Sequence, residues 1–288
     1  MLRILTAGQA PRINKMFWSF FLCLALTCGL GLAGCGGSGA SSPATQNQPP
    51  ATPPGPTNPV TQNPPSPAPQ PAPPPVPQPL LQALSAQGPV RIMPLGDSNT
   101  FGIFVPGAYR IKLYQNLTAD GINAHFVGSL SNGPDSLPSQ ANEGHSGWTI
   151  GNIADAVDGW LKTYNPQIVL LMIGTNNMPA GQDIPSAEHQ LSALIDQIAK
   201  DIPQAHIVVA SIPPVTWPPD NANVLQYNAA IPGIVAAKAG QGEHVSFMDM
   251  YAAVPISDLA SYAHLNAAGY DKMADAWYTT LKTLTTAN

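Results

Sequence analysis

The chain has 288 residues, only 9% of them charged, and 17 of its 33 prolines lie between Pro43 and Pro79. No Asp, Glu, Lys or Arg occurs from Met16 to Val90, whereas residues 91–288 carry 8 basic and 16 acidic side chains, a formal charge of −8. A stretch like the first cannot bury enough apolar surface to offset its ordering entropy, so we predict one folded domain at residues 89–288. The acidic balance, with no basic stripe, argues against nucleic acid as a partner.

The first 35 residues have the pattern of a bacterial export signal. Three basic residues precede an apolar run from Met16 to Leu32, and the following Leu32-Ala33-Gly34-Cys35 resembles a lipobox. We predict a signal peptide over residues 1–35, lipidation of Cys35, and a disordered Pro-rich linker over residues 36–88. The folded domain would then be exported and tethered to a membrane of the cell envelope. An uncleaved membrane anchor is the alternative, because the apolar run approaches spanning length.

Cysteine and histidine usage bear on metals and cofactors. The cysteines are Cys23, Cys28 and Cys35, so residues 89–288 contain no thiol that could form a disulfide or bind a metal. The six histidines show no metal-ligand spacing. We therefore predict neither a metal nor a cofactor.

Apolar runs alternate with helical periodicity along residues 89–288, which is typical of a parallel sheet with helices on both faces. The runs that we interpret as strands are Val90 to Leu95, Ala124 to Val127, Ile168 to Ile173, Ile207 to Ala210 and Val245 to Met248. Helical stripes separate or follow them: Ile150, Ile153, Val157 and Leu161; Leu191, Leu194, Ile195 and Ile198; and Met273, Trp277, Leu281 and Leu284. The pattern predicts an α/β fold, a flavodoxin-like three-layer α/β/α sandwich with a five-stranded parallel sheet. The prolines of Ser211 to Asp220 predict a loop after the fourth strand.

Polar residues follow several of these strands. Ser98 follows the first strand, Gly147 lies in the loop after the second, Asn176 follows the third and His264 follows the fifth. Ligands of open parallel sheets bind beyond the carboxyl ends of the strands. We therefore expect these four residues at one edge of the sheet.

Ser98 and His264 suit the two proton-transfer roles of ester hydrolysis. A serine hydroxyl becomes a nucleophile only when a base lies within hydrogen-bond reach, and a histidine with a pKa near 6.5 can take and return a proton. A Gly-Asp-Ser tripeptide alone would carry little weight, since Asp and Ser also cap helices. His145 is a second candidate, for substrate contact.

Four blocks together resemble the SGNH hydrolases, the GDSL esterase/lipase superfamily, over about Val90 to Leu284. They are Leu95-Gly96-Asp97-Ser98-Asn99-Thr100, Gly144-His145-Ser146-Gly147-Trp148-Thr149, Gly174-Thr175-Asn176-Asn177 and His264-Leu265-Asn266-Ala267-Ala268-Gly269-Tyr270. The amino-acid sequences of these blocks most resemble those of carbohydrate esterase family three, the acetyl xylan esterase-like branch. The resemblance implies a Ser98 nucleophile, a His264 base and an oxyanion hole made by Ser98, Gly147 and Asn176.

The chain departs from this family at Ser261, where members usually carry an Asp three residues before the catalytic histidine. We consider three arrangements: Asp258 completes the catalytic group, a main-chain carbonyl near Ser261 accepts the ring N–H, or the enzyme is impaired. A carbonyl selects the correct ring tautomer without supplying charge. We favour a working pair of Ser98 and His264, with Asp258 as a candidate third member.

The resemblance, the export signal and the stalk together predict a tethered serine esterase that removes acyl groups, with acetyl first, from carbohydrate. Arg110, Glu143 and Trp148 are candidate substrate-wall residues, although an ion pair and core packing would explain them equally. Trp217 is either a substrate platform or a lid over apolar surface. The alternatives are a lipase, lysophospholipase or thioesterase with the same machinery, and a non-catalytic carbohydrate-binding relic, which Ser261 motivates.

Overall fold

The computed structural model describes residues 77–179 and 181–286. The predicted signal peptide, the lipidation site Cys35 and most of the predicted linker lie outside these residues. Within the described ranges, none of the helices combines the length and apolar character needed to cross a bilayer.

A seven-stranded sheet forms the centre of the fold, in the order β3-β4-β1-β5-β6-β7, with β2 paired to β1. β5 lies next to β1 in parallel register, from Ile92 opposite Ile168 to Gly96 opposite Met172. Every residue of β5 is buried, as its unbroken apolar run predicts for a strand covered on both faces. The strands are β1 (Val90–Gly96), β2 (Ala124–Phe126), β3 (Leu130–Ser131), β4 (Ala141–Gly144), β5 (Ile168–Met172), β6 (His206–Ala210) and β7 (Val245–Met248).

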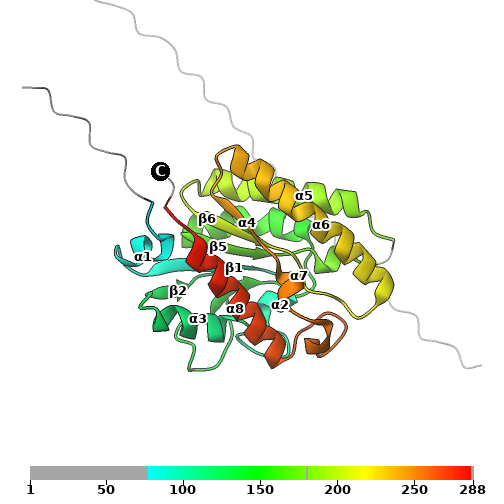
Figure 1. Ribbon diagram of the computed structural model, residues 1–288, viewed down its shortest axis with the longest axis horizontal. Coiled ribbons are helices and arrows are strands. Elements are labelled where there is room, and N and C mark those ends of the chain that lie inside the picture. The colour runs from blue at the N-terminus through cyan, green and yellow to red at the C-terminus, as the bar shows by residue number, and fades with distance from the viewer. Residues whose placement is uncertain (1–76, 180, 287–288) are drawn as a thin grey trace, which may run out of the picture. The chain divides into compact units, whose positions relative to one another are not determined.

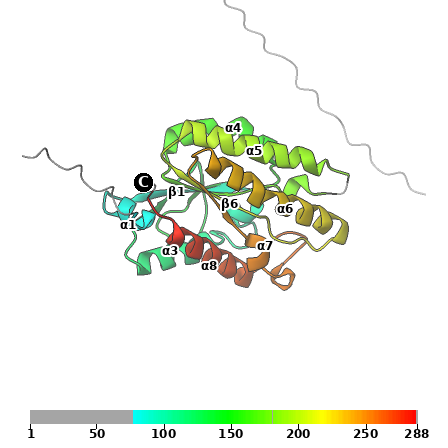
Figure 2. The same cartoon turned by 45° about the horizontal axis from the view of Figure 1, so that its top comes forward.

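Helices cover both faces of the sheet and complete the predicted three-layer α/β fold (Figures 1 and 2). α4, α5 and α6 pack side by side in one layer, while α3 and α8 pack together in the other, as the turned view in Figure 2 shows. The helices are α1 (Leu80–Ser85), α2 (Ser98–Phe101), α3 (Arg110–Ala119), α4 (Ile150–Tyr164), α5 (Ile184–Asp201), α6 (Pro218–Gly240), α7 (Met250–Ala253) and α8 (Ala267–Thr283), with the 3-10 turns η1 (Thr175–Asn177) and η2 (Ile256–Asp258).

The core is built from the stripes that the helical spacing predicts. Each of the three helices with a predicted apolar stripe turns that face toward the core, and the predicted residues of the stripe are buried. They are Ile150, Ile153, Val157 and Leu161 of α4, Leu191, Leu194, Ile195 and Ile198 of α5, and Met273, Trp277 and Leu281 of α8, with Leu284 just beyond it. Trp277 is thus a core residue, not a binding residue.

The prediction of five parallel strands is wrong in number and in one direction. β3 and β4 were not expected, and they pair with each other antiparallel. β4 joins the sheet through Leu95 and Gly96 of β1, opposite Glu143 and Gly144. Its sequence Ala-Asn-Glu-Gly has no apolar run, so periodicity could not reveal it.

Two predicted loop boundaries also differ. Ser211 to Asp220 was expected to be a loop throughout, but Pro218 and Pro219 occupy the first turn of α6, where a missing N–H breaks no hydrogen bond. The predicted linker was expected to run to residue 88, but α1 lies inside that range and buries Leu81 against the core.

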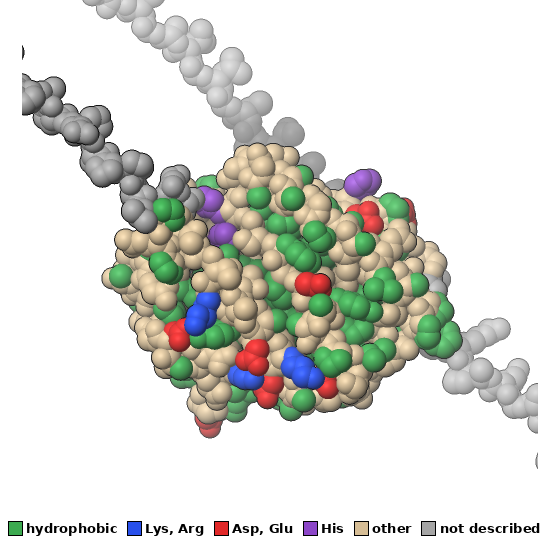
Figure 3. All heavy atoms as spheres, viewed as in Figure 1, with side chains coloured by type: hydrophobic (Ala, Val, Ile, Leu, Met, Phe, Trp, Pro, Cys, Tyr) green, Lys and Arg blue, Asp and Glu red, His purple; other side chains and the backbone are tan. Residues whose placement is uncertain are grey.

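The two ends of the described chain meet at one edge of the sheet. The N–H of Leu80 donates to the carbonyl of Leu284 at 2.8 Å, and Pro79 forms a β-bridge with Thr285. Figure 1 shows α1 beside the end of α8, whereas α2 and α7 lie toward the other end of the strands. On the surface over α3 and α8, basic and acidic side chains are interspersed and form no patch of a single charge (Figure 3). Lys112 and Asp275 form one such ion pair.

Candidate active site

The first strand-end motif forms a tight turn that places Ser98 at the carboxyl end of β1. Ser98 begins α2, and the Asp97 carboxylate caps this helix by accepting a hydrogen bond from the Asn99 N–H at 2.9 Å. Gly96 permits the close packing of this turn, because an added Cβ would lie 2.2 Å from the carbonyl oxygen of Met172. The turn leaves Ser98 7% exposed, so its hydroxyl is in a site that is mostly shielded from water.

His264 lies in the loop before α8 and its ring reaches Ser98. The His264 Nε2 atom is 2.9 Å from the Ser98 Oγ atom, across 166 positions of the chain. The Asn99 side chain ties the Ser98 turn to the His264 loop, since its Nδ2 donates to the carbonyl of Ala263 at 3.0 Å. The structure thus brings together the predicted nucleophile and the predicted base at hydrogen-bond distance.

The other ring nitrogen of His264 does not contact Asp258. Its Nδ1 atom is 2.9 Å from the hydroxyl of Ser261. The Asp258 carboxylate, at the end of η2, instead forms an ion pair with Lys272 of α8. The predicted third catalytic member is therefore not next to the ring, because α8 carries a cation that holds it elsewhere. A side-chain hydroxyl occupies this position, which was not among the three arrangements that we considered from the sequence.

The surroundings of His264 favour its neutral form. Burial lowers the pKa of the His264 ring below its ordinary value, because a charged imidazolium loses hydration there. Phe104 meets the ring edge-on, with the two ring centroids 5.3 Å apart. A base must be unprotonated to accept the serine proton, so this shift keeps His264 available at neutral pH.

The predicted oxyanion donors follow strands on either side of β1. Gly147 follows β4 and Asn176 lies in η1 directly after β5, while Ser98 follows β1 between them. The prediction that Gly147 lies in the loop after the strand at residues 124–127 is therefore corrected, because its loop follows β4. Gly147 has φ +82°, a conformation that favours glycine, although an added Cβ would meet nothing within 4 Å. The Asn176 Nδ2 atom donates to the carbonyl of Trp148 at 2.8 Å, which leaves its second N–H for a ligand.

A stack of rings holds the segment before Gly147. The ring of His145 stacks on the indoles of Trp148 and Trp160, with centroid distances of 4.2 and 4.6 Å, and the two indoles are themselves 6.0 Å apart. Its Nε2 atom is 2.8 Å from the fully buried carboxylate of Glu143. The stacking and the Glu143 contact hold His145, whose side chain is 12% exposed, as a support of this loop. Sequence reasoning gave no sign of Trp160, which lies outside the apolar stripe of α4.

Arg110 and Glu143, two of the three candidate wall residues, have contacts inside the protein. Arg110 is fully buried, and its guanidinium donates to main-chain carbonyls that include Gln140 and Phe101. Glu143 accepts hydrogen bonds from Ser129 as well as contacting His145. These two residues therefore brace the loops around the site from inside the protein.

The exposed apolar side chains near the dyad differ from these. Phe104, which contacts the His264 ring, is 56% exposed, and Trp217 is 57% exposed. The loop of Trp217 is fixed to the His264 loop, because the Thr216 N–H donates to the Tyr262 carbonyl at 2.8 Å. This exposure leaves much of the Trp217 indole open to solvent, as the role of a substrate platform would require.

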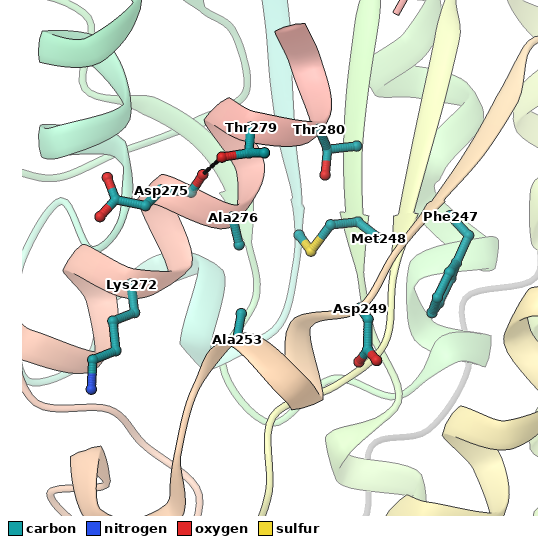
Figure 4. Close-up of a pocket in the computed structure, with 9 residues that line it drawn as sticks. All are labelled: Phe247, Met248, Asp249, Ala253, Lys272, Asp275, Ala276, Thr279 and Thr280. Atoms are coloured by element: carbon teal, nitrogen blue, oxygen red, sulfur yellow. Dashed lines mark hydrogen bonds between the residues drawn. The ribbon is translucent and has the colours of Figure 1, made fainter. Parts of the chain in front are cut away.

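A separate hollow of about 490 Å³ lies between β7, α7 and α8, and contains neither Ser98 nor His264 (Figure 4). Figure 4 shows Met248 and Phe247 on one side and the helix residues Asp275 and Thr279 on the other. The Thr279 hydroxyl donates to the carbonyl of Asp275 in its own helix. Lys272 and Asp275 at this hollow are engaged in surface ion pairs, and Asp249 accepts hydrogen bonds from Ser211 and from the start of α7, so the hollow is separate from the chemistry of the dyad.

Comparison with known proteins decides the family. A family profile described as GDSL-like lipase/acylhydrolase matches residues 95–272, which is more than half of the chain. The chain belongs to this family. Membership places the described domain among GDSL-type carboxylic ester hydrolases, as the strand-end blocks predict.

The similar proteins include esterases with carbohydrate-related names. The chain is 32% identical over 221 residues to a multidomain esterase of Ruminococcus flavefaciens, covering 67% of this chain and 28% of the relative. It spans 56% of the length of a second curated relative. Among solved structures, a Clostridium thermocellum family 3 carbohydrate esterase is 41% identical with a TM-score of 0.60, covering 66% of this chain and 94% of that one. A carbohydrate esterase family 3 from Talaromyces cellulolyticus is 27% identical with a TM-score of 0.60, covering 67% and 96%.

Proposed function

We propose that this GDSL-family protein is a serine esterase that removes acyl groups, acetyl first among them, from carbohydrate. The observation that carries the mechanism is the 2.9 Å contact between His264 Nε2 and Ser98 Oγ. It argues against a non-catalytic relic, because a serine and a base at this distance form an activated nucleophile.

In the proposed reaction, the Ser98 oxygen attacks the ester carbonyl carbon while His264 takes the hydroxyl proton. Negative charge develops on the carbonyl oxygen, where the N–H groups of Ser98, Gly147 and Asn176 would stabilise it. The carbon–oxygen bond to the sugar then breaks, and His264 returns its proton to the departing sugar oxygen. Water then attacks the acyl-serine while His264 takes one of its protons; the bond between the acyl carbon and the Ser98 oxygen breaks, His264 returns the proton to Ser98, and the carboxylic acid is released.

Support for a carbohydrate substrate comes from the comparisons and from the rim of the dyad. Phe104, Trp217 and Tyr262 are exposed aromatic side chains, and exposed apolar surface of this kind marks binding sites. Aromatic faces pack against the C–H faces of sugar rings, and their amphipathic character suits a wet surface. Two solved structures with the same fold are named carbohydrate esterases of family 3.

The first test is release of acetate by the purified full chain, compared with Ser98→Ala and with Ser257→Ala, an exposed serine that serves as the matched control. We expect turnover of p-nitrophenyl acetate and acetylated xylan to fall at least 10³-fold in Ser98→Ala, the order found when a triad member is removed, and to stay unchanged in the control. A fluorophosphonate probe should label the wild type and the control only. Equal turnover by Ser98→Ala would defeat the serine mechanism.

Chain-length preference separates sugar ester from lipid ester substrates. We expect faster turnover of acetate than of decanoate esters, and Trp217→Ala should raise KM for acetylated xylan more than KM for p-nitrophenyl acetate. An enzyme that prefers decanoate, with no effect of Trp217→Ala on the polymer, would be a lipase of the same family.

We also propose that the protein is exported and anchored through a lipid on Cys35. The basis is the lipobox-like sequence alone, which lies outside the described residues. Metabolic labelling with an alkynyl fatty acid should mark the wild type and leave Cys35→Ser unlabelled and released from membranes. Equal labelling of both chains would exclude this anchor.

A further inference from the structure

The ring of His264 has a serine hydroxyl on each of its two nitrogens. Nε2 contacts Ser98 and Nδ1 contacts Ser261, each at 2.9 Å. The position of Ser261 is the one in which the family usually carries a carboxylate, so the bond that orients the ring is present here without the charge.

The hydroxyl of Ser261 can bond to the ring in two ways. A hydroxyl both donates and accepts, whereas a carboxylate only accepts. If Nδ1–H donates to Ser261, Nε2 is left unprotonated and can take the Ser98 proton. If the hydroxyl donates to Nδ1, the proton lies on Nε2 and the ring cannot act as a base.

The loop holds Ser261 beside the ring, and the first arrangement is the one that a working base requires. The main-chain N–H groups of Ala260 and Ser261 both point to the carbonyl of His264, at 2.8 and 3.3 Å, and close a tight turn around the ring's own residue. Ser261 is half-buried, so water can accept its hydroxyl proton while its oxygen accepts from Nδ1.

The carboxylates on the elements around His264 are committed to other partners. Asp258 forms an ion pair with Lys272, and Asp97 caps α2 through Asn99. Asp220 accepts a hydrogen bond from the hydroxyl of Tyr262 at 2.6 Å. Within residues 77–179 and 181–286, a neutral side chain therefore occupies the orienting position.

We propose that Ser261 is a positioning residue for the esterase reaction proposed above: its oxygen accepts the Nδ1–H bond of His264 and so holds Nε2 free to take the proton of Ser98. The reactive group is thus a serine–histidine–serine arrangement in which no carboxylate stabilises the imidazolium. The inference rests on the proposed esterase function.

An arrangement without charge has a consequence for pH dependence. A carboxylate beside an imidazole raises the pKa of the ring by favouring the imidazolium, whereas a hydroxyl does not. Burial alone lowers the pKa of His264 here. The enzyme should therefore keep its base neutral at a pH where an enzyme with a carboxylate in this position has lost it.

The experiment compares Ser261→Ala, Ser261→Thr and Ser261→Asp in the full chain, with Ser257→Ala as a hydroxyl deletion in the same loop. The readouts are kcat for p-nitrophenyl acetate and the rate of fluorophosphonate labelling of Ser98 against pH. We expect kcat to fall about 10-fold in Ser261→Ala with KM unchanged, the size of one neutral hydrogen bond. Ser261→Thr should restore it, and Ser261→Asp should move the acidic limb up by about one pH unit.

The outcomes are distinguishable from failure of the function itself. Wild-type kcat in Ser261→Ala, equal losses in the Ala and Thr variants, or an unmoved limb in Ser261→Asp would each overturn the positioning role. Thermal melting identifies a variant that fails to fold. If Ser261→Ala fails to fold, the kcat of Ser261→Thr and the pH profile of Ser261→Asp test the positioning role. If Ser98→Ala is as active as wild type, the esterase proposal falls instead.

Discussion

The two halves of the sheet are held together by different forces. β5 is buried along its whole length with only apolar side chains, and β6 and β7 extend the same parallel register. β4 is also buried, but its core residues Asn142 and Glu143 are polar and fully covered. Hydrophobic burial builds the first half, whereas directional hydrogen bonds build the second, next to the oxyanion loop. The apolar half therefore depends on filled volume, whereas the half that carries the Gly147 loop depends on specific hydrogen-bond partners.

The largest effect is expected from a cavity in the apolar half. Leu170→Ala in β5 removes a side chain that is 0% exposed, and such truncations cost about 3 to 4 kcal/mol of unfolding free energy. We expect urea unfolding to show this loss while the folded fraction keeps its kcat. Leu170→Met, which conserves volume, should cost less than about 1.5 kcal/mol. If kcat fell by more than the loss of folded protein explains, the apolar half would also determine the geometry of the site, which contradicts the proposed difference between the two halves.

The polar start of β6 provides a pH test. Burial, with a smaller contribution from His244, lowers the pKa of His206 from 6.5 to about 4. Below pH 6.5 the unfolded chain binds a proton that the folded chain refuses, so stability falls with pH, by about 3 kcal/mol at pH 4. Urea unfolding of His206→Gln should lack this part of the acid loss. His189→Gln, an exposed histidine on α5, should retain it, and parallel curves for both variants would contradict the assignment.

Next in size is the loss of one buried acceptor in the polar half. Glu143→Gln removes the negative charge and replaces one accepting oxygen by an NH2 donor, so the side chain can no longer accept from both the Ser129 main chain and the His145 ring, which should cost about 2 kcal/mol of unfolding free energy. Because the same carboxylate holds the ring stack before Gly147, we expect kcat to fall about 10-fold in the folded enzyme. Asp155→Asn, an exposed carboxylate on α4, is the control. If Glu143→Gln lowered stability but left kcat unchanged, the hydrogen bonds of β4 would not determine the position of the Gly147 loop.

The smallest effect is expected at the surface. Lys112→Gln breaks an ion pair with Asp275 in which both side chains are partly exposed, and solvent screening limits its value to under about 0.5 kcal/mol. Unfolding in low salt and in 1 M salt should differ little between the variant and wild type. If the unfolding free energy fell by more than about 1 kcal/mol, the ion pair would contribute substantially to the packing of α3 against α8.

Strand order alone predicts that Ser98 and His264 lie at the same edge of the sheet, whereas their pairing as nucleophile and base was implied by the family resemblance. Parallel strands end at one edge of a sheet, and apolar runs locate those strands in the sequence. The role of Ser261 could not be predicted in the same way. The sequence reveals only that a carboxylate is absent there, and a hydroxyl within reach of a ring is a matter of loop conformation.

The elements that escaped prediction lack hydrophobic periodicity. β4 has polar core residues whose cost of burial is offset by partners such as Ser129, far from it in sequence. α1 was assigned to the linker because the surrounding sequence is uncharged and rich in proline. Leu80 and Leu81 gave a short apolar signal, but six residues are too few to establish a helix from spacing.

The closure of α1 against the end of α8 determines where earlier residues of the chain must join the folded part. Leu80 and Thr285 border the starts of β6 and β7, at the amino ends of the strands. Ser98 and His264 lie past the carboxyl ends. The chain therefore enters the described part at residue 77 on the side of the sheet opposite Ser98 and His264, so a fusion partner or an immobilising tag joined there would leave both residues accessible.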